Sequence, residues 1–182
     1  MLGAFTHSKL CELNPAFFCS FGIEESLQSP PDDKESLVRL CGMLMNYFRC
    51  MRKFETKCEI SYDFRPYKYL PNSVIFVWDI CLQGSYLNQD YLRFAKCYKS
   101  AIQEITVCRK TFDTAYDSYF SPYEIKDPEL IEEICDKHQQ NVDCISEEIR
   151  KKCGPEAKHV FLRIVHHSKY LQMTCPKYDN DN

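Results

Sequence analysis

Hydrophobic residues recur every three or four positions along most of the chain, which is the period of a helix with one buried face. In residues 33–58 this stripe is widened by further apolar side chains. Its members are Leu37, Leu40, Cys41, Leu44, Phe48, Met51 and Phe54, flanked by Val38, Met43, Met45 and Tyr47. Because a wide apolar stripe needs cover on several sides, we expect this helix at the centre of the fold. Asp32 or Asp33 is placed to cap its first turn.

Further helices are predicted where the same period returns. The strongest is over residues 89–108, and shorter helices are expected near residues 15–27 and 72–82. The chain has only five glycines and no sustained alternation of apolar and polar residues. Such a sequence leaves little room for a β-sheet.

A hairpin of two helices is predicted toward the C-terminal end. The first helix, over residues 127–153, starts with Asp-Pro-Glu. These residues supply a capping carboxylate, a proline where no amide donor is needed and an acid near the positive end of the helix. The polar segment 140–143 leaves open whether this helix continues or divides in two. Gly154 ends it, and a second helix follows over residues 155–171.

Twelve cysteines are spread along the chain, and this even number predicts six disulfide bonds. They are Cys11, Cys19, Cys41, Cys50, Cys58, Cys81, Cys97, Cys108, Cys135, Cys144, Cys153 and Cys175. Structural zinc sites need cysteines two to four residues apart, and no such pair occurs, so we expect no metal. Because cytosolic glutathione keeps thiols reduced, the pattern predicts a secreted, extracellular protein.

The spacing of cysteines within the predicted helices constrains their partners. Cys41 and Cys50, nine residues apart, point to opposite sides of a helix and lie about 13 Å apart along it, too far for a mutual bond. The same step recurs at Cys135, Cys144 and Cys153. Cys97 and Cys108 face nearly the same direction and are expected to join two levels of one neighbouring layer. The spacing leaves the actual pairing open.

Together these patterns predict an all-α fold, a compact array of about five or six helices cross-linked by disulfides, with long aromatic loops. A length of 182 residues with 45% hydrophobic content fits a single domain over residues 1–182, with a core from 10 to 176 and a polar tail from 177 to 182. Residues 1–10 lack the pattern of a secretory signal peptide, so we expect a mature or trimmed chain.

Charge and hydropathy exclude two classes of partner. The formal net charge of -3 supplies no basic field for phosphates, so we expect no nucleic acid. The mean hydropathy of -0.43, without a run of about eighteen apolar residues, predicts no membrane span.

The chain carries none of the common catalytic motifs. It has no G-x-S-x-G, glycine-rich phosphate loop, H-E-x-x-H or EF-hand loop, so we expect no enzymatic activity and no cofactor. His159, His166 and His167 could bind a metal or titrate as a pH switch, but solvated histidines on an amphipathic helix are the favoured interpretation. Solvated helix faces also account for the acidic pairs Glu24-Glu25, Glu132-Glu133 and Glu147-Glu148.

Aromatic side chains gather in two stretches without helical period, residues 59–71 and 111–126. The candidate partner-binding residues are Tyr62, Phe64, Tyr67, Tyr69, Phe112, Tyr116, Tyr119, Phe120 and Tyr123. Tyrosine in loops offers a large, rigid contact with a polar tip, which suits protein recognition. The alternative is that these loops cover helix ends, with each hydroxyl reaching solvent.

Cysteine placement from Cys11 to Cys175 carries one resemblance. The segments concerned are Cys41-x8-Cys50-x7-Cys58, Phe94-Ala95-Lys96-Cys97, Cys135-x8-Cys144 and Ile149-Arg150-Lys151-Lys152-Cys153-Gly154. They resemble the secreted cysteine-rich domain-of-unknown-function family expanded in nematodes. The Cys-Gly helix ending is also similar to those of secreted arthropod proteins of haemolymph, saliva or silk. The resemblance implies a helical secreted fold, and no catalytic residues come with that family.

These observations support two hypotheses of function. The first is a secreted interaction or structural component that presents aromatic loops and binds another extracellular protein. The second is a carrier, in which the helix of residues 33–58, rich in Met and Phe, lines a cavity for a lipid or other small hydrophobic ligand. A venom or salivary effector is a third interpretation, which the sequence does not separate from the first.

Overall fold

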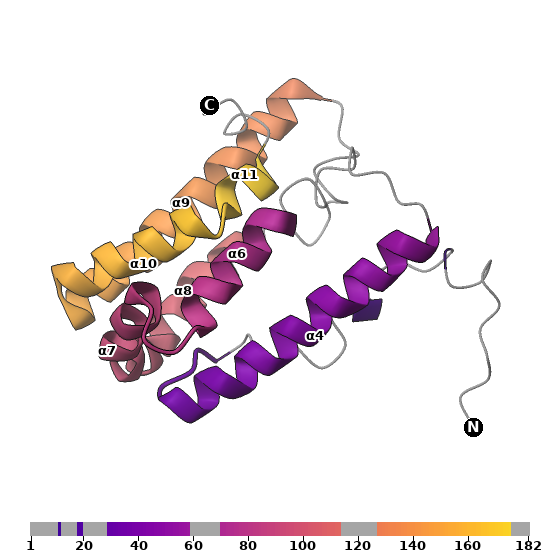
Figure 1. Ribbon diagram of the computed structural model, residues 1–182. Coiled ribbons are helices and arrows are strands. Elements are labelled where there is room, and N and C mark those ends of the chain that lie inside the picture. The colour runs from indigo at the N-terminus through magenta and orange to yellow at the C-terminus, as the bar shows by residue number, and fades with distance from the viewer. Residues whose placement is uncertain (1–10, 12–17, 20–28, 59–69, 114–126, 176–182) are drawn as a thin grey trace.

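The computed structural model describes residues 11, 18–19, 29–58, 70–113 and 127–175, and the chain forms seven helices within them (Figure 1). They are α4 (Lys34–Cys58), α6 (Leu70–Cys81), α7 (Tyr86–Ser100), α8 (Ile102–Asp113), α9 (Pro128–Cys153), α10 (Pro155–His167) and α11 (Tyr170–Thr174). No strand occurs among these residues. The prediction of an all-α, disulfide-cross-linked helical array is therefore confirmed.

The predicted helix starts lie where the capping chemistry places them. A carboxylate oxygen of Asp33 accepts a hydrogen bond from the amide of Ser36 at 2.7 Å, just before α4 begins. Asp127 accepts from the amide of Glu129 at 3.0 Å and caps α9 in the same way. The polar segment 140–143 does not divide α9, which is continuous to Cys153. Gly154 then adopts a φ of 88°, a backbone conformation that favours glycine, and the chain turns into α10.

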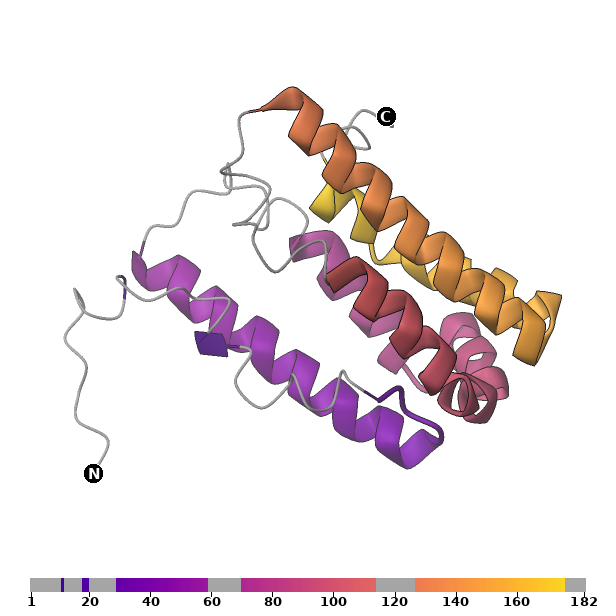
Figure 2. The same cartoon turned by 180° about the vertical axis from the view of Figure 1, so that it is seen from behind.

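The helix predicted over residues 89–108 is two helices, so that prediction is wrong. The first, α7, starts three residues earlier because Ser85 caps it, accepting from the amide of Asn88 at 3.1 Å. It ends before Ala101, whose amide donates to the carbonyls of Cys97 and Tyr98. The two helices run in different directions beyond this point (Figure 2). Because Ala101 is itself buried, the apolar period continues across the junction and does not show it.

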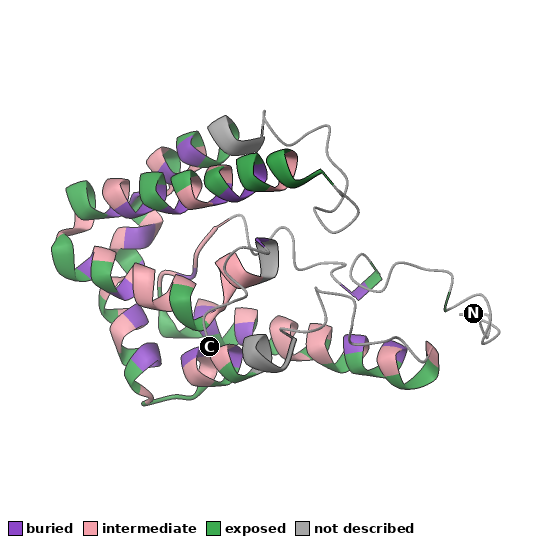
Figure 3. Ribbon diagram, turned by 90° about the horizontal axis from the view of Figure 1, so that it is seen from above, coloured by how far each residue is buried: buried purple, intermediate pink, exposed green. Residues whose placement is uncertain are grey.

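The main core lies where α7, α8, α9 and α10 meet, and buried residues recur along these helices (Figure 3). Three of its members are alanines that are fully buried, which lets the helix backbones approach closely: Ala95, Ala101 and Ala157. Two buried tyrosines donate their hydroxyls to backbone carbonyls, Tyr91 to Pro31 at 2.7 Å and Tyr98 to Ala157 at 2.9 Å. Burial raises the pKa of both phenols, so they remain neutral donors.

The helix expected at the centre, α4, instead lies at the edge of the array and packs mainly against α6 (Figures 1 and 2). Its first half adds Leu37 and Cys41 to the main core. Its second half places Met51 and Phe54 in a separate small cluster with Cys19. The wide apolar stripe is thus divided between two clusters, which corrects the prediction of a central helix.

Five disulfides cross-link the array. They are Cys11–Cys58, Cys19–Cys50, Cys41–Cys81, Cys97–Cys153 and Cys108–Cys144. Cys41 and Cys50 bond to different partners, and Cys97 and Cys108 both bond to α9, so the two geometric predictions are confirmed. Cys41–Cys81 is the one bond that joins α4 to another described helix.

The expected pairing of all twelve cysteines is not met at Cys135, which the structure shows as a free cysteine. Its side chain is fully buried, as is that of Cys175. Cys135 lies nine residues before Cys144, so the two point to opposite sides of α9, and Cys144 is bonded to α8. The five bonds described above account for ten of the twelve cysteines predicted to form disulfides.

Candidate functional site

Most of the aromatic residues predicted to bind a partner lie outside the described residues. These are Tyr62, Phe64, Tyr67, Tyr69, Tyr116, Tyr119, Phe120 and Tyr123. Phe112 belongs to α8, but its side chain is also outside the described part of the structure. Recognition by these loops remains a prediction.

Three of the exposed large hydrophobic residues lie along one side of α6. Ile75, Trp78 and Leu82 are 59%, 55% and 56% exposed, and we call these three residues the α6 stripe. Their spacing of three and four residues places them on one helix face. Leu82 follows the last residue of α6, but its amide still donates to the carbonyl of Trp78 at 2.8 Å, which continues the helical pattern. Tyr86, at the start of α7, is 88% exposed.

The opposite face of α6 borders an apolar cleft with a volume of about 310 Å³. From α6 it is lined by Phe76, Val77, Ile80 and Cys81. From α4 it is lined by Leu37, Leu40, Cys41 and Leu44, and Tyr91 and Ser168 complete the lining. The disulfide Cys41–Cys81 connects the two walls.

The composition of α6 explains both the exposed α6 stripe and the apolar cleft on its opposite face. Asp79 is the only charged residue of the helix, and apolar side chains occupy positions all around its axis. A helix of this kind is normally covered on every side. Among the described helices, α4, α7 and α10 pack against α6 and leave the α6 stripe exposed. Exposed apolar surface on a folded helix is typical of an interaction site.

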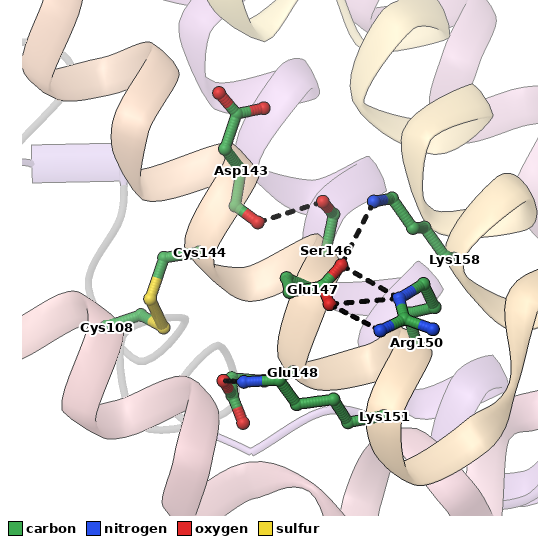
Figure 4. Close-up of polar contacts among 9 residues, drawn as sticks. All are labelled: Cys108, Asp143, Cys144, Ser146, Glu147, Glu148, Arg150, Lys151 and Lys158. Carbon is green, nitrogen blue, oxygen red and sulfur yellow. Dashed lines mark hydrogen bonds and ion pairs between the residues drawn. A yellow bond between two sulfur atoms is a disulfide. The ribbon is translucent and has the colours of Figure 1, made fainter.

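The described acidic pairs contribute ion pairs along helix surfaces, while Glu24-Glu25 lies outside the described residues. Glu133 accepts from Lys137 at 2.5 Å. Glu147 accepts from Arg150 at 2.7 Å and from Lys158 at 3.4 Å, and Glu148 accepts from Lys151 at 2.7 Å (Figure 4). The Arg150 guanidinium lowers the pKa of Glu147 to about 2, so this carboxylate stays ionised. The opposite charges neutralise each other, and none of these residues lines the apolar cleft.

The three histidines considered from the sequence do not assemble a site. His159, His166 and His167 are exposed side chains of α10. Within the described ranges there is no group of three or more His, Cys, Asp or Glu residues that could hold a metal ion.

A fourth histidine, which the sequence did not single out, is the one with an unusual environment. His138 is buried on α9, and its Nδ1 lies 2.8 Å from the hydroxyl of Tyr170 in α11. Burial lowers the pKa of His138 to about 4, so its ring is neutral near pH 7. The sequence did contain a signal of this burial, because His138 lies between Cys135 and Val142 on the apolar face of α9.

Lowering the pH from about 6.5 to about 4.5 is expected to reduce the free energy of unfolding through His138. In this range the unfolded chain takes up a proton at the imidazole, whereas the folded protein resists protonation down to about pH 4. This contribution is complete above pH 6.5 and declines as the pH falls. Thermal unfolding of His138→Gln should show a flatter pH dependence over this range than the unchanged protein. His166→Gln, an exposed control, should leave the slope as it is.

The fold and its surfaces define a disulfide-rich all-α protein with an exposed apolar helix face and an adjacent apolar cleft. None of the described helices has the length and hydrophobicity needed to cross a membrane. Comparisons with protein-family models, with curated proteins and with solved structures found no match to this chain. The resemblance to the nematode and arthropod proteins therefore remains a hypothesis.

Proposed function

We propose that this chain is a secreted protein that acts outside the cell by binding another protein through the α6 stripe. The observation that carries the proposal is the row of three exposed apolar side chains, Ile75, Trp78 and Leu82, on a helix otherwise packed into the fold. The five disulfides support an oxidising, extracellular location. In this role the protein is a binding scaffold and not an enzyme, and a venom or salivary effector would use it in the same way.

The stripe is held on a rigid support. The side-chain amide of Asn88 donates to the carbonyl of Ile80 at 2.8 Å, and the Ser85 hydroxyl donates to the carbonyl of Asp79. These bonds fix the turn between α6 and α7, while the bond between Cys41 and Cys81 fixes α6 to α4. Because little conformational freedom remains to be lost on binding, such a surface is preorganised for a partner.

Trp78 is at the centre of the stripe and is the only tryptophan of the chain. Tryptophan is over-represented among residues that dominate binding energy at protein interfaces. We therefore expect Trp78 to insert into an apolar pocket of the partner, with Ile75 and Leu82 on either side.

Replacing Trp78 with alanine is expected to weaken binding of the partner at least tenfold, or by about 1.4 kcal/mol. The partner would be isolated from extracellular fluid with the unchanged protein as bait, and its affinity then measured by titration. Val107→Ala on α8, another exposed apolar residue, is the matched control and should bind normally. A partner bound equally by all three proteins would contradict the role of the stripe.

Because the chain has a single tryptophan, contact between Trp78 and the partner can be measured directly. In protein labelled with 5-fluorotryptophan, the fluorine spectrum should contain one signal, from Trp78. Contact with the partner should shift or broaden that signal, because the ring leaves water. A signal that stays unchanged in the saturated complex would place the interface elsewhere.

The apolar cleft supports a second candidate function, binding of a small hydrophobic ligand. Its volume of about 310 Å³ is at the lower end of the range of ligand pockets, and nearly all of its lining is apolar. The α4 residues that line it are leucines and Cys41, not the methionines and phenylalanines that the sequence suggested. A compact apolar molecule, or part of an acyl chain, matches this lining.

A further inference from the structure

Helices α9 and α11 pack against each other and run in opposite directions. The chain turns at Gly154, and α10 and α11 then return along α9 toward its first residue (Figure 1). Within this pair, His138 of α9 lies against Tyr170 of α11, with Nδ1 and the hydroxyl 2.8 Å apart and the two ring centroids 5.6 Å apart. This contact fixes which residues of the two elements stand opposite each other.

Starting from the contact between His138 and Tyr170, each of the two helices leads to a cysteine, and both cysteines lie in the same direction. Cys135 is three residues before His138, which is about 4.5 Å along the axis of α9. Cys175 is five residues after Tyr170, which is about 7.5 Å along α11 at the same rise per residue. Because the elements are antiparallel, these two displacements point the same way and differ by about 3 Å. The two cysteines therefore lie at nearly the same level of the contact.

Their side chains also face the interior. Cys135 and Cys175 are both 0% exposed. Cys135 is three residues from His138, so the two share one side of α9, the side that meets α11. The amide of Cys175 donates to the carbonyl of Leu171 at 2.7 Å, which holds this residue at the end of α11. The described disulfides span Cα–Cα distances of 5.4 to 5.9 Å between packed elements, a separation that a close contact of this kind provides.

We propose that Cys135 and Cys175 form a sixth disulfide bond, which joins α11 to α9. In the reaction the two thiols release two protons and two electrons as the sulfur–sulfur bond forms. A disulfide oxidant, such as oxidised glutathione or the disulfide of an oxidoreductase, accepts them and becomes two thiols. Exchange proceeds through a mixed disulfide on one of the two cysteines.

The burial of both sulfurs determines when this bond can form. No oxidant can reach a fully buried thiol, so exchange must take place before α11 packs against α9. The bond would then form before α11 packs, and it would retain the segment that follows α10. It also completes the stapling of α9, whose other two cysteines are bonded to α8 and α7.

The test is a count of free thiols in the full chain produced in an oxidising compartment. The protein is denatured without reduction, treated with N-ethylmaleimide and weighed by mass spectrometry. We expect no label, and a proteolytic digest should contain one linked pair of peptides that carries Cys135 and Cys175. Two labels, on Cys135 and Cys175, would overturn the proposal, and so would either cysteine linked to a different partner.

A variant separates this outcome from misfolding. In Cys135→Ser we expect one label, on Cys175, with the peptide pairs of the five other disulfides unchanged. An unlabelled Cys135→Ser chain would overturn the proposal, because Cys175 would then be bonded elsewhere. Labelling of all twelve cysteines in the unchanged protein would also overturn it, and would contradict the secreted location as well.

Discussion

Replacing Ile149 with alanine is expected to lower the free energy of unfolding by about 2–5 kcal/mol. Ile149 is 1% exposed and belongs to the main core on α9, where α7, α8 and α10 all pack. The shorter side chain loses buried apolar surface and leaves a cavity that these stapled helices cannot close. Denaturant unfolding with the disulfides intact measures the change.

The matched control is Ile75→Ala, which makes the same chemical change on the α6 stripe. Because Ile75 is largely exposed, its loss should alter the free energy of unfolding by no more than about 0.5 kcal/mol. A large loss at Ile75 would mean that another part of the chain covers the stripe, and a small loss at Ile149 would mean that the core is placed wrongly. The two variants thus test the buried core and the exposed α6 stripe with the same change from isoleucine to alanine.

Local chemistry made much of the fold predictable from the sequence. The caps at Asp33 and Asp127, the turn at Gly154 and the continuous apolar face of α9 depend on residues close together in the chain. The disulfide geometry was predictable for the same reason. Cys97 and Cys108, eleven residues apart, both bond to α9, even though the chain changes direction between them.

Features that depend on distant parts of the chain were not predictable. The apolar width of α4 shows how much surface it would bury, but not that this surface is divided among two clusters and a cleft. The junction at Ala101 has no breaking residue, because a small buried alanine suits a helix interior and a close crossing equally well. The environment of His138 arises only when α11 returns to α9.

The candidate site shows the same division between local and distant information. Loop tyrosines suggested recognition by a general tendency of their residue type, whereas the α6 stripe emerges from what the other helices leave uncovered. The sequence did contain a sign of it. Residues 74–81 carry one charge, Asp79, and have no polar face that could meet water. A short helix without a polar face must either be enclosed or present apolar surface.

Both surfaces of α6 depend on how α4 is held, and Cys41–Cys81 is the bond that holds it. Replacing both cysteines with alanine is expected to lower the free energy of unfolding by about 2–4 kcal/mol, because the unfolded chain regains the freedom of a loop that spans 40 residues. The same change should release the wall that α4 contributes to the cleft. Titration with N-phenyl-1-naphthylamine, a neutral fluorescent hydrophobic probe, is expected to show affinity reduced roughly tenfold or more.

The double variant Cys97→Ala/Cys153→Ala separates the loss of the cleft from a general loss of stability. Its bond spans 56 residues, so its removal should destabilise the protein to a similar extent, but it joins α7 to α9 and leaves α4 attached to α6. We therefore expect comparable denaturation midpoints for the two variants, with probe binding retained only where Cys41–Cys81 is intact. Equal loss of binding in both would show that the probe reports stability and not the cleft. Unchanged binding in both would place the hydrophobic site elsewhere and leave the α6 stripe as the functional surface.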